Sequence, residues 1–222
     1  MPSRRRFLCE ALAGAAALSI TDQTFKPTAW AHTTLSPDAA VQQLIDGNVR
    51  FAEGRMTSFD EDLSILKAKT VDKQEPFAAV LSYADSRVPV ELIFDQSIGH
   101  LFVTRVAGNI ATSPMIASLE YGVAVLGTKA IMVLGHANCG AVKAAIDAKA
   151  APGQISVLYP YIRPAVEQAG PDLEAAIKAN AKIQAALLRQ SSPVLAEQIK
   201  RNQLKIVAAY YDLASGKVTI LD

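Results

Sequence analysis

The chain has 222 residues, of which half are hydrophobic and 19% are charged. This is enough apolar sequence for one well-buried core, and it does not require two domains. The 22 basic and 21 acidic residues nearly balance, so we expect neither a nucleic-acid partner nor a disordered acidic tail.

Residues 1–31 have the layout of a signal peptide. The paired arginines Arg4-Arg5 precede a mildly apolar stretch, Leu12–Ile20, and the small-x-small site Ala29-Trp30-Ala31 follows it. The arginine pair ahead of Phe-Leu is typical of the twin-arginine type. An uncleaved membrane anchor is the alternative, but the apolar stretch is too short to span a bilayer comfortably. We therefore expect a periplasmic or otherwise exported protein whose domain, 32–222, has no membrane span.

Cysteine usage supports a special role for one thiol. Cleavage after Ala31 removes Cys9 and leaves Cys139 as the one cysteine of the mature chain, which then has no internal disulfide. Metal ligation is one reason to keep a single cysteine in an exported protein. Burial as a small apolar side chain is the alternative.

The mature chain begins with a predicted helix. Ser36 is a favourable N-cap, and Pro37 suits the first helical position. Apolar residues at helical spacing continue to about Ala52. Since this helix precedes the first strand, we expect an N-terminal helical arm whose apolar face covers another surface.

Apolar runs of strand length then alternate with helical segments. The expected strands are Phe77–Tyr83, Leu101–Val106, Ala130–Leu134, Leu204–Tyr211 and Val218–Leu221, and the expected helices are Val90–Phe94, Ser113–Leu126, Cys139–Ala148, a segment within Pro152–Gly170, Leu173–Gln190 and Ser192–Asn202. The alternation predicts an α/β fold with a mostly parallel sheet flanked by helices. The short turn at Ala214–Gly216 predicts an antiparallel hairpin at the sheet edge.

Two polar clusters follow predicted strands. Tyr83–Arg87 comes after the first strand, and His136–Gly140 comes after the third. Ligands of open α/β sheets collect at the carboxyl ends of the strands, so the clusters face each other if these two strands are neighbours.

Each cluster has a functional and a structural interpretation. His136-x-x-Cys139 offers an imidazole nitrogen and a thiolate, both of which suit zinc, and the predicted helix N-terminus at Cys139 favours the thiolate. The same pair is also compatible with ordinary hydrogen-bonded structure. Asp85-x-Arg87 taken alone is compatible with a plain surface ion pair.

Together, the clusters resemble the β-class carbonic anhydrases, whose signature is Cys-x-Asp-Ser-Arg after the first strand and His-x-x-Cys-Gly after the third. This chain has Tyr83-x-Asp85-Ser86-Arg87 and His136-x-x-Cys139-Gly140, and Arg105–Asn109 and Ser118–Gly122 are also similar to that family. The resemblance covers the whole mature chain.

The resemblance implies reversible hydration of carbon dioxide to bicarbonate through zinc-bound hydroxide. The implied metal ligands are His136 and Cys139. Asp85 would orient the hydroxide, and Arg87 would keep Asp85 ionised and off the metal. In the family the N-terminal arm wraps a neighbouring subunit, which implies a homodimer or a higher even oligomer.

Position 83 departs from the family, whose first zinc ligand is a cysteine. Three arrangements remain open: Tyr83 ligates as a phenolate, Asp85 becomes the third protein ligand, or zinc does not bind usefully. The chain is therefore either an exported zinc lyase or a non-catalytic relative acting as a binding or structural subunit. Hydrolysis of carbonyl sulfide or carbon disulfide is a third hypothesis on the same fold.

Overall fold

The computed structural model describes residues 33–58, 68 and 70–221. The signal peptide expected at 1–31 therefore lies outside the described residues, and its prediction stays untested. Among the helices that are described, none combines the length and the apolar character needed to cross a bilayer.

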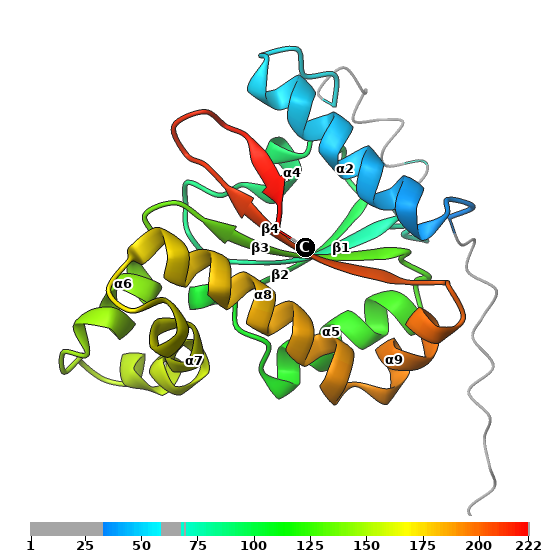
Figure 1. Cartoon of the computed structure of the whole chain (residues 1–222). Helices are drawn as coiled ribbons and strands as arrows, with labels where there is room; N and C mark the ends of the chain where they lie inside the picture. Colours follow the sequence, from blue (N-terminus) through cyan, green and yellow to red (C-terminus); the bar gives the residue numbers. More distant parts are fainter. Residues whose placement is uncertain (1–32, 59–67, 69, 222) are drawn as a thin grey trace, which may run out of the picture.

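A five-stranded sheet forms the centre of the molecule (Figure 1). Its order is β2-β1-β3-β4-β5, with β1 to β4 parallel and β5 antiparallel to β4. The strands are β1 (Ala78–Ser82), β2 (Leu101–Arg105), β3 (Ala130–His136), β4 (Lys205–Tyr211) and β5 (Val218–Ile220). The predicted α/β class, parallel sheet and antiparallel edge hairpin are confirmed.

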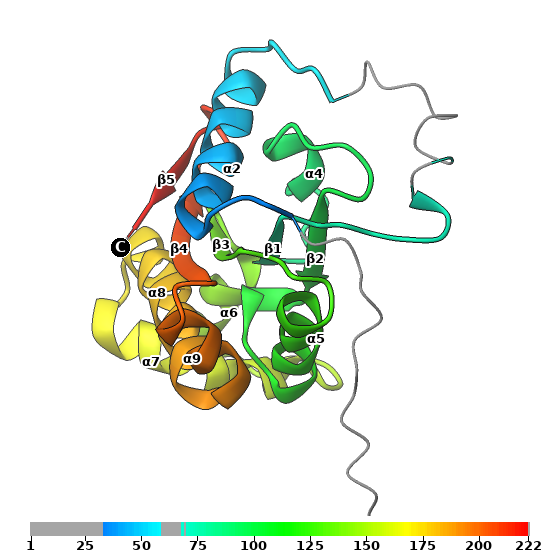
Figure 2. The same ribbon diagram turned by 90° about the vertical axis from the view of Figure 1, so that its right-hand side faces the viewer.

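The three central strands β1, β3 and β4 are buried on both faces, which explains their continuous apolar runs. Val80 and Met132 point to the side covered by α2 (Pro37–Ala52) and α4 (Val90–Ile93). Leu81 and Val133, one residue further along each strand, point to the other side. That side is covered by α5 (Ser113–Ala124), α8 (Leu173–Ser191) and α9 (Pro193–Lys200), as Figures 1 and 2 show.

The N-terminal helix α2 begins as predicted. The Ser36 hydroxyl accepts a hydrogen bond from the Ala39 N–H at 3.1 Å, and Pro37 is the first helical residue. Leu44 is fully buried in the core cluster on this side of the sheet. The surface that α2 covers therefore belongs to the chain's own sheet, and its apolar face does not by itself require a second subunit.

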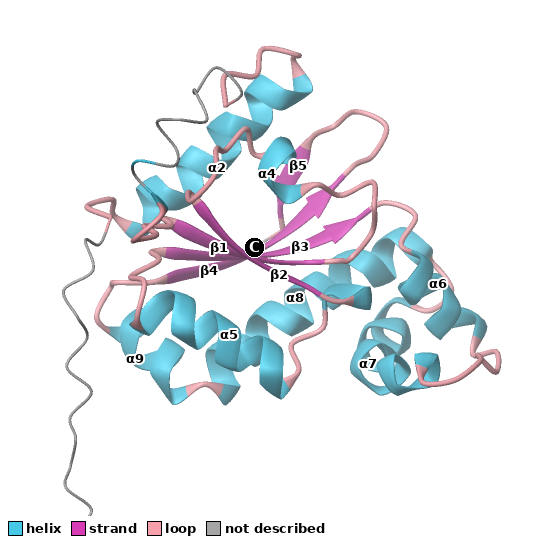
Figure 3. Ribbon diagram, turned by 180° about the vertical axis from the view of Figure 1, so that it is seen from behind, coloured by secondary structure: helices cyan, strands magenta, loops and turns pink. Residues whose placement is uncertain are grey.

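Helices α6 (Gly140–Asp147) and α7 (Tyr159–Ala169) lie together at one side of the molecule (Figure 3), and the 3-10 turn η2 (Ile155–Leu158) precedes α7. They share a third apolar cluster with Cys139 and with Ile177 of α8. Another 3-10 turn, η1 (Ala107–Asn109), follows β2 and contacts β1, β3 and α6. These elements enclose the carboxyl ends of the strands, where both polar clusters lie.

Candidate metal and active site

Neighbouring strands bring the two polar clusters together. β1 pairs in parallel with β3, so Tyr83, just after β1, and His136, the last residue of β3, lie at the same edge of the sheet. Strand β3 runs two residues beyond its predicted end because Gly135 and His136 pair with Tyr210 and Tyr211 of β4. The juxtaposition expected from the sequence is confirmed.

A double hydrogen bond joins Asp85 to Arg87. The Arg87 Nε donates to Asp85 Oδ1 at 2.9 Å, and its Nη2 donates to Oδ2 at 2.7 Å. The Arg87 backbone N–H donates to the same carboxylate at 2.9 Å. These bonds favour the ionised form, so the pKa of Asp85 falls to about 2. Arg87 thus fixes the Asp85 carboxylate in place, and only 12% of the Asp85 side chain is exposed.

His136 is fully buried and presents a free ring nitrogen. Its Nδ1 lies 2.9 Å from the Ala137 carbonyl oxygen. A carbonyl only accepts, so Nδ1 carries the proton and Nε2 has a lone pair. Nε2 is buried with no hydrogen-bond partner among the described residues, and Asp85 Oδ2 is 3.8 Å from it. Burial lowers the pKa of His136, so the ring is neutral and suited to metal ligation.

Cys139 lies at the N-terminus of α6, as predicted, with 1% of its surface exposed. Burial raises the pKa of its thiol, although hydrogen bonds from the backbone N–H groups of Val142 and Ala141 act in the opposite direction. The thiol therefore keeps its proton at neutral pH in the absence of a metal. A metal ion would have to displace that proton, which makes metal affinity depend on pH.

Tyr83 lies against His136 with its ring face. The ring centroids are 5.2 Å apart, and the ring planes differ by 27°. The Nε2 lone pair lies in the plane of the imidazole, whereas the tyrosine ring is stacked on its face. Burial raises the pKa of Tyr83, and the nearby Asp85 carboxylate raises it further, as a Cys139 thiolate would. The phenol is therefore protonated at neutral pH and is a poor ligand in this arrangement.

The donor set fits zinc only in part. His136 and Cys139 offer the nitrogen and sulfur atoms that zinc prefers. Within the part of the chain that the structure describes, however, no three His, Cys, Asp or Glu side chains are grouped closely enough to hold a metal ion. Asp85 is the nearest candidate for the third donor, and Arg87 holds it. Two metal-binding side chains, His136 and Cys139, are therefore available. A third is available only if the Asp85 carboxylate rotates away from Arg87 towards the metal position.

Some interactions in and around this site were not predicted. Asn138 adopts a left-handed backbone conformation, with φ at 55°, and its carbonyl oxygen lies 3.4 Å from Arg87 Nη2. The buried amides of Asn180 and Gln184 bond to each other at 3.2 Å. They also hold η1 and the loop after it: Asn180 donates to the Gly108 carbonyl at 2.9 Å, and Gln184 accepts from the Ala111 N–H at 2.8 Å. The one feature of the sequence that could have indicated this contact is the pair of amides four residues apart on an alanine-rich helix.

Comparison with known proteins agrees with the geometry. Residues 78–218 match the family described as carbonic anhydrase. Carbonic anhydrase 2 of Mycobacterium tuberculosis is 34% identical over 198 residues, which cover 84% of this chain and 94% of that protein. The solved β-carbonic anhydrase CcaA has a TM-score of 0.65 at 28% identity, over 82% of this chain and 95% of that chain. The Coccomyxa β-carbonic anhydrase, solved in complex with acetazolamide, has a TM-score of 0.64 at 26% identity, over 82% and 86%.

Proposed function

Because the chain belongs to the β-class carbonic anhydrase family, we propose that it hydrates carbon dioxide reversibly to bicarbonate with zinc held by His136 and Cys139. The observation that carries this proposal is the buried, unpartnered Nε2 of His136, 3.8 Å from Asp85 Oδ2. A buried polar atom without a partner is rare in a native protein and calls for an explanation such as a missing ligand.

Each side chain then has a defined task. Zinc, when bound, supplies the Lewis acidity that lets water ionise near neutral pH. His136 and Cys139 hold the ion, and the Ala137 carbonyl fixes the ring proton of His136 on Nδ1. Before a metal binds, Arg87 keeps Asp85 ionised, and the carboxylate can accept a hydrogen bond from a water molecule at the site. Gly140 is the first residue of α6, so its backbone N–H has no partner within the helix and could donate to a substrate oxygen.

The third protein ligand distinguishes this chain from its family. We propose that Asp85 takes this position by leaving Arg87, and that Tyr83 does not ligate, because its ring is stacked on His136. A carboxylate engaged with the metal is less available to orient water. The proposed enzyme is therefore weaker than a relative that has a cysteine at position 83.

A non-catalytic role is the alternative, and one observation favours it. No group of three metal-binding side chains is assembled among the residues that the structure describes. Since metal affinity depends on the number of ligands and on their fixed geometry, losing one thiolate costs much of that affinity. In this case the protein acts as a binding or structural subunit.

Metal content separates the two functions. Zinc is measured in the purified full chain, in Tyr83→Cys, in Cys139→Ser and in the double variant, together with the hydration rate. We expect Tyr83→Cys to raise both quantities and Cys139→Ser to lower both, with non-additive effects because the changes share one metal. Tyr83→Phe is the matched control and should leave zinc content unchanged. If Tyr83→Phe loses zinc, the phenol is a ligand. If no variant holds zinc, the non-catalytic role is favoured.

Location and assembly complete the proposal. We propose export by the twin-arginine route, based on Arg4-Arg5 and Ala29-Trp30-Ala31. Replacing both arginines by lysine should retain the protein in the cytoplasm, and normal export of that variant would contradict the proposal.

We also propose an even oligomer. It is supported by the edge strand β2, which pairs with no further strand in the described part of the chain, and by the exposed aromatic ring of Tyr121 beside it.

A further inference from the structure

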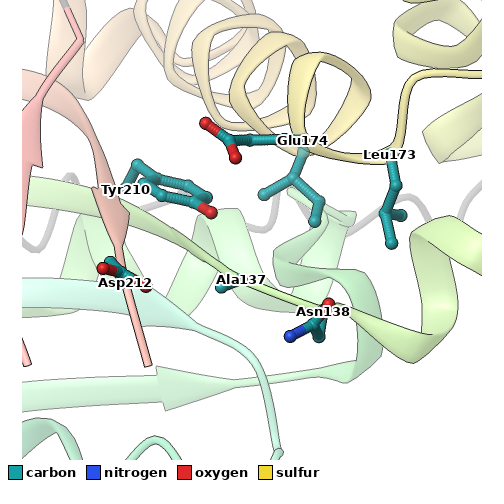
Figure 4. Close-up of a pocket in the computed structure, with 7 residues that line it drawn as sticks. Ala137, Asn138, Leu173, Glu174, Tyr210 and Asp212 are labelled. Atoms are coloured by element: carbon teal, nitrogen blue, oxygen red, sulfur yellow. The ribbon is translucent and has the colours of Figure 1, made fainter. Parts of the chain in front are cut away.

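A cavity of about 260 Å³ lies behind the turn that carries His136 and Cys139. Figure 4 shows it between the end of β4, the first turn of α8 and the backbone of residues 137–138. The lining residues are Ala137, Asn138, Leu173, Glu174, Ile177, Tyr210 and Asp212. Because liquid water occupies about 30 Å³ per molecule, the cavity has the volume of roughly eight to nine waters, enough for a small organic molecule.

The Tyr210 hydroxyl opens into this cavity. Tyr210 is only 9% exposed, and its ring reaches under α8 with the hydroxyl directed into the cavity (Figure 4). The ammonium of Lys178 lies 4.8 Å from the ring centroid. Within the described residues, no group forms a hydrogen bond with the hydroxyl itself. The hydroxyl is therefore available to bond to water or to a polar molecule held in the cavity.

The charges around the cavity favour a cation. Glu174 is paired with Lys178 at 2.5 Å, so these two charges largely cancel. The Asp212 carboxylate accepts hydrogen bonds from the Ser215 hydroxyl at 2.7 Å and from the Ala214 N–H at 3.1 Å, which lower its pKa and keep it ionised. No cation in the described part of the chain pairs with Asp212. The net charge of this wall is therefore negative.

We propose that this cavity binds a small protonated amine with a short aliphatic body. The ammonium group would donate to Asp212 and to the Tyr210 hydroxyl oxygen, and the aliphatic part would lie on Leu173 and Ile177. Charge-assisted hydrogen bonds of this kind are stronger than neutral ones. Apolar walls with a few converging polar groups are typical of small-molecule sites.

The cavity is connected to the candidate metal site through two carbonyl groups. Ala137 and Asn138 line the cavity, and their carbonyl oxygens contact His136 Nδ1 at 2.9 Å and Arg87 Nη2 at 3.4 Å. Ala137, Cys139, Ile177 and Tyr210 also belong to one apolar cluster. A ligand that shifts this backbone changes the positions of His136 and Arg87. Binding of the amine and of zinc should therefore be coupled, and the coupling is reciprocal.

The test uses three probes of similar shape and different charge: n-butylammonium, 1-butanol and butyrate. Each is titrated into the uniformly ¹⁵N-labelled full chain, both as purified and after removal of metal by a chelator, while backbone amide shifts are followed. We expect butylammonium to shift the amides of Asn138, Glu174 and Asp212, butanol to bind at least threefold more weakly, and butyrate not to bind. Zinc should change the butylammonium affinity if the sites are coupled.

Variants identify the site. Tyr210→Phe keeps the ring and removes the hydroxyl, and Asp212→Asn removes the charge. Each should weaken butylammonium binding about tenfold or more, as expected for the loss of one hydrogen bond to a charged group. Glu197→Gln, on the exposed side of α9, is the matched control and should have no effect. Melting temperatures show that the variants are folded.

Three results would overturn the proposal. Equal binding of all three probes would indicate a plain apolar cavity. Preferred binding of butyrate would show that the cavity favours an anion and not a cation. Butylammonium binding that disappears on metal removal and persists in Tyr210→Phe would place the amine on the metal. Because the expected binding needs no catalysis, it can succeed even if hydration activity is absent.

Discussion

At the scale of single residues, the candidate site depends on which groups Asp85 and His136 bond to. Arg87 donates two side-chain hydrogen bonds to Asp85, while His136 keeps an unpartnered nitrogen close by. Tyr83 covers the imidazole face instead of contributing a thiolate. The balance between Arg87 and the metal for the one carboxylate therefore decides how well the site works.

Arg87→Gln should raise the pKa of Asp85 from about 2 towards its ordinary value near 3.9, because the charged double hydrogen bond is lost. The folded-state pKa is depressed, so the stabilisation by Arg87 is fully present above about pH 4 and is lost as pH falls towards 2. Carboxyl-carbon NMR titration of the metal-free protein measures the change.

Ser86→Ala, a change at the exposed neighbouring position, is the control for that titration. A pKa of Asp85 that stays near 2 in Arg87→Gln would show that other groups, and not Arg87, depress it.

At the scale of elements, close backbone approach places α2 on the sheet. A Cβ added at Gly47 would lie 1.8 Å from the carbonyl oxygen of Phe94, a distance that no side chain tolerates. On the same helix, Asn48 donates to the Ile93 and Gly216 carbonyls at 3.1 and 2.9 Å. Helix α2 is thereby bonded to both the α4 region and the turn before β5.

Gly47→Ala should therefore force α2 away from Phe94 and lower the free energy of unfolding by about 2–3 kcal/mol, as over-packing does elsewhere. Urea unfolding followed by circular dichroism measures it. Val49→Ala, on the exposed side of the same helix, should change stability by less than about 0.5 kcal/mol. If the two changes lowered the free energy of unfolding equally, the close contact between Gly47 and Phe94 would not be important for stability.

The end of α2 has a second attachment through Asp95, whose side chain is fully buried. Its carboxylate accepts hydrogen bonds from Arg50 Nε at 2.5 Å, the Ser58 N–H at 2.9 Å and the Thr57 N–H at 3.0 Å. Burial alone would raise the pKa of Asp95, but these bonds outweigh it and hold the pKa well below its usual range. The segment after α2 is therefore fixed to the loop after α4 by an ionised carboxylate.

Asp95→Asn should lower the free energy of unfolding at pH 7 by about 3 kcal/mol, because Arg50 loses its buried partner. Since the folded-state pKa is depressed, the contribution of Asp95 is complete above about pH 4 and declines as pH falls further. The difference between parent and variant should shrink between pH 5 and pH 2.5 in urea titrations. A difference that is constant over this range would exclude the ionised carboxylate as its cause.

At the scale of the whole molecule, β2 is an edge strand of the sheet formed by the described residues. Phe102 of β2 packs against Tyr121 of α5 with ring centroids 6.4 Å apart, and Tyr121 is 45% exposed. Ile98, in the loop before β2, is 58% exposed. An edge strand bordered by apolar side chains is a surface that another chain can cover.

Tyr121→Lys should shift the proposed oligomer towards monomer, because a charge would be placed in the contact between subunits. Sedimentation velocity at micromolar concentration measures the change. Val194→Lys, at a partly exposed position on α9, is the matched control and should leave assembly unaffected. A parent chain that sediments as a monomer would contradict the proposed oligomer outright.

Local patterns in the sequence determined where the helices and strands lie along the chain. Ser36-Pro37 marked the start of α2 to the residue, and the apolar runs located all five strands within about two residues of their observed ends. The alternation of strands and helices led to the parallel sheet, because parallel neighbours need a long crossover connection, which is usually a helix. The spacing of Asp85, Arg87, His136 and Cys139 also led to the family.

The tertiary structure decided how these residues meet. Pairing of β1 with β3 brings Asp85 within reach of His136, a contact across 51 residues of sequence that no local pattern contains. The packing of α2 on the chain's own sheet and the cavity under α8 depend in the same way on distant segments. The sequence by itself determined which chemical groups are present and at which strand ends. Their mutual distances, burial and protonation were decided by the packing around them, because those properties arise from neighbours that only the folded chain supplies.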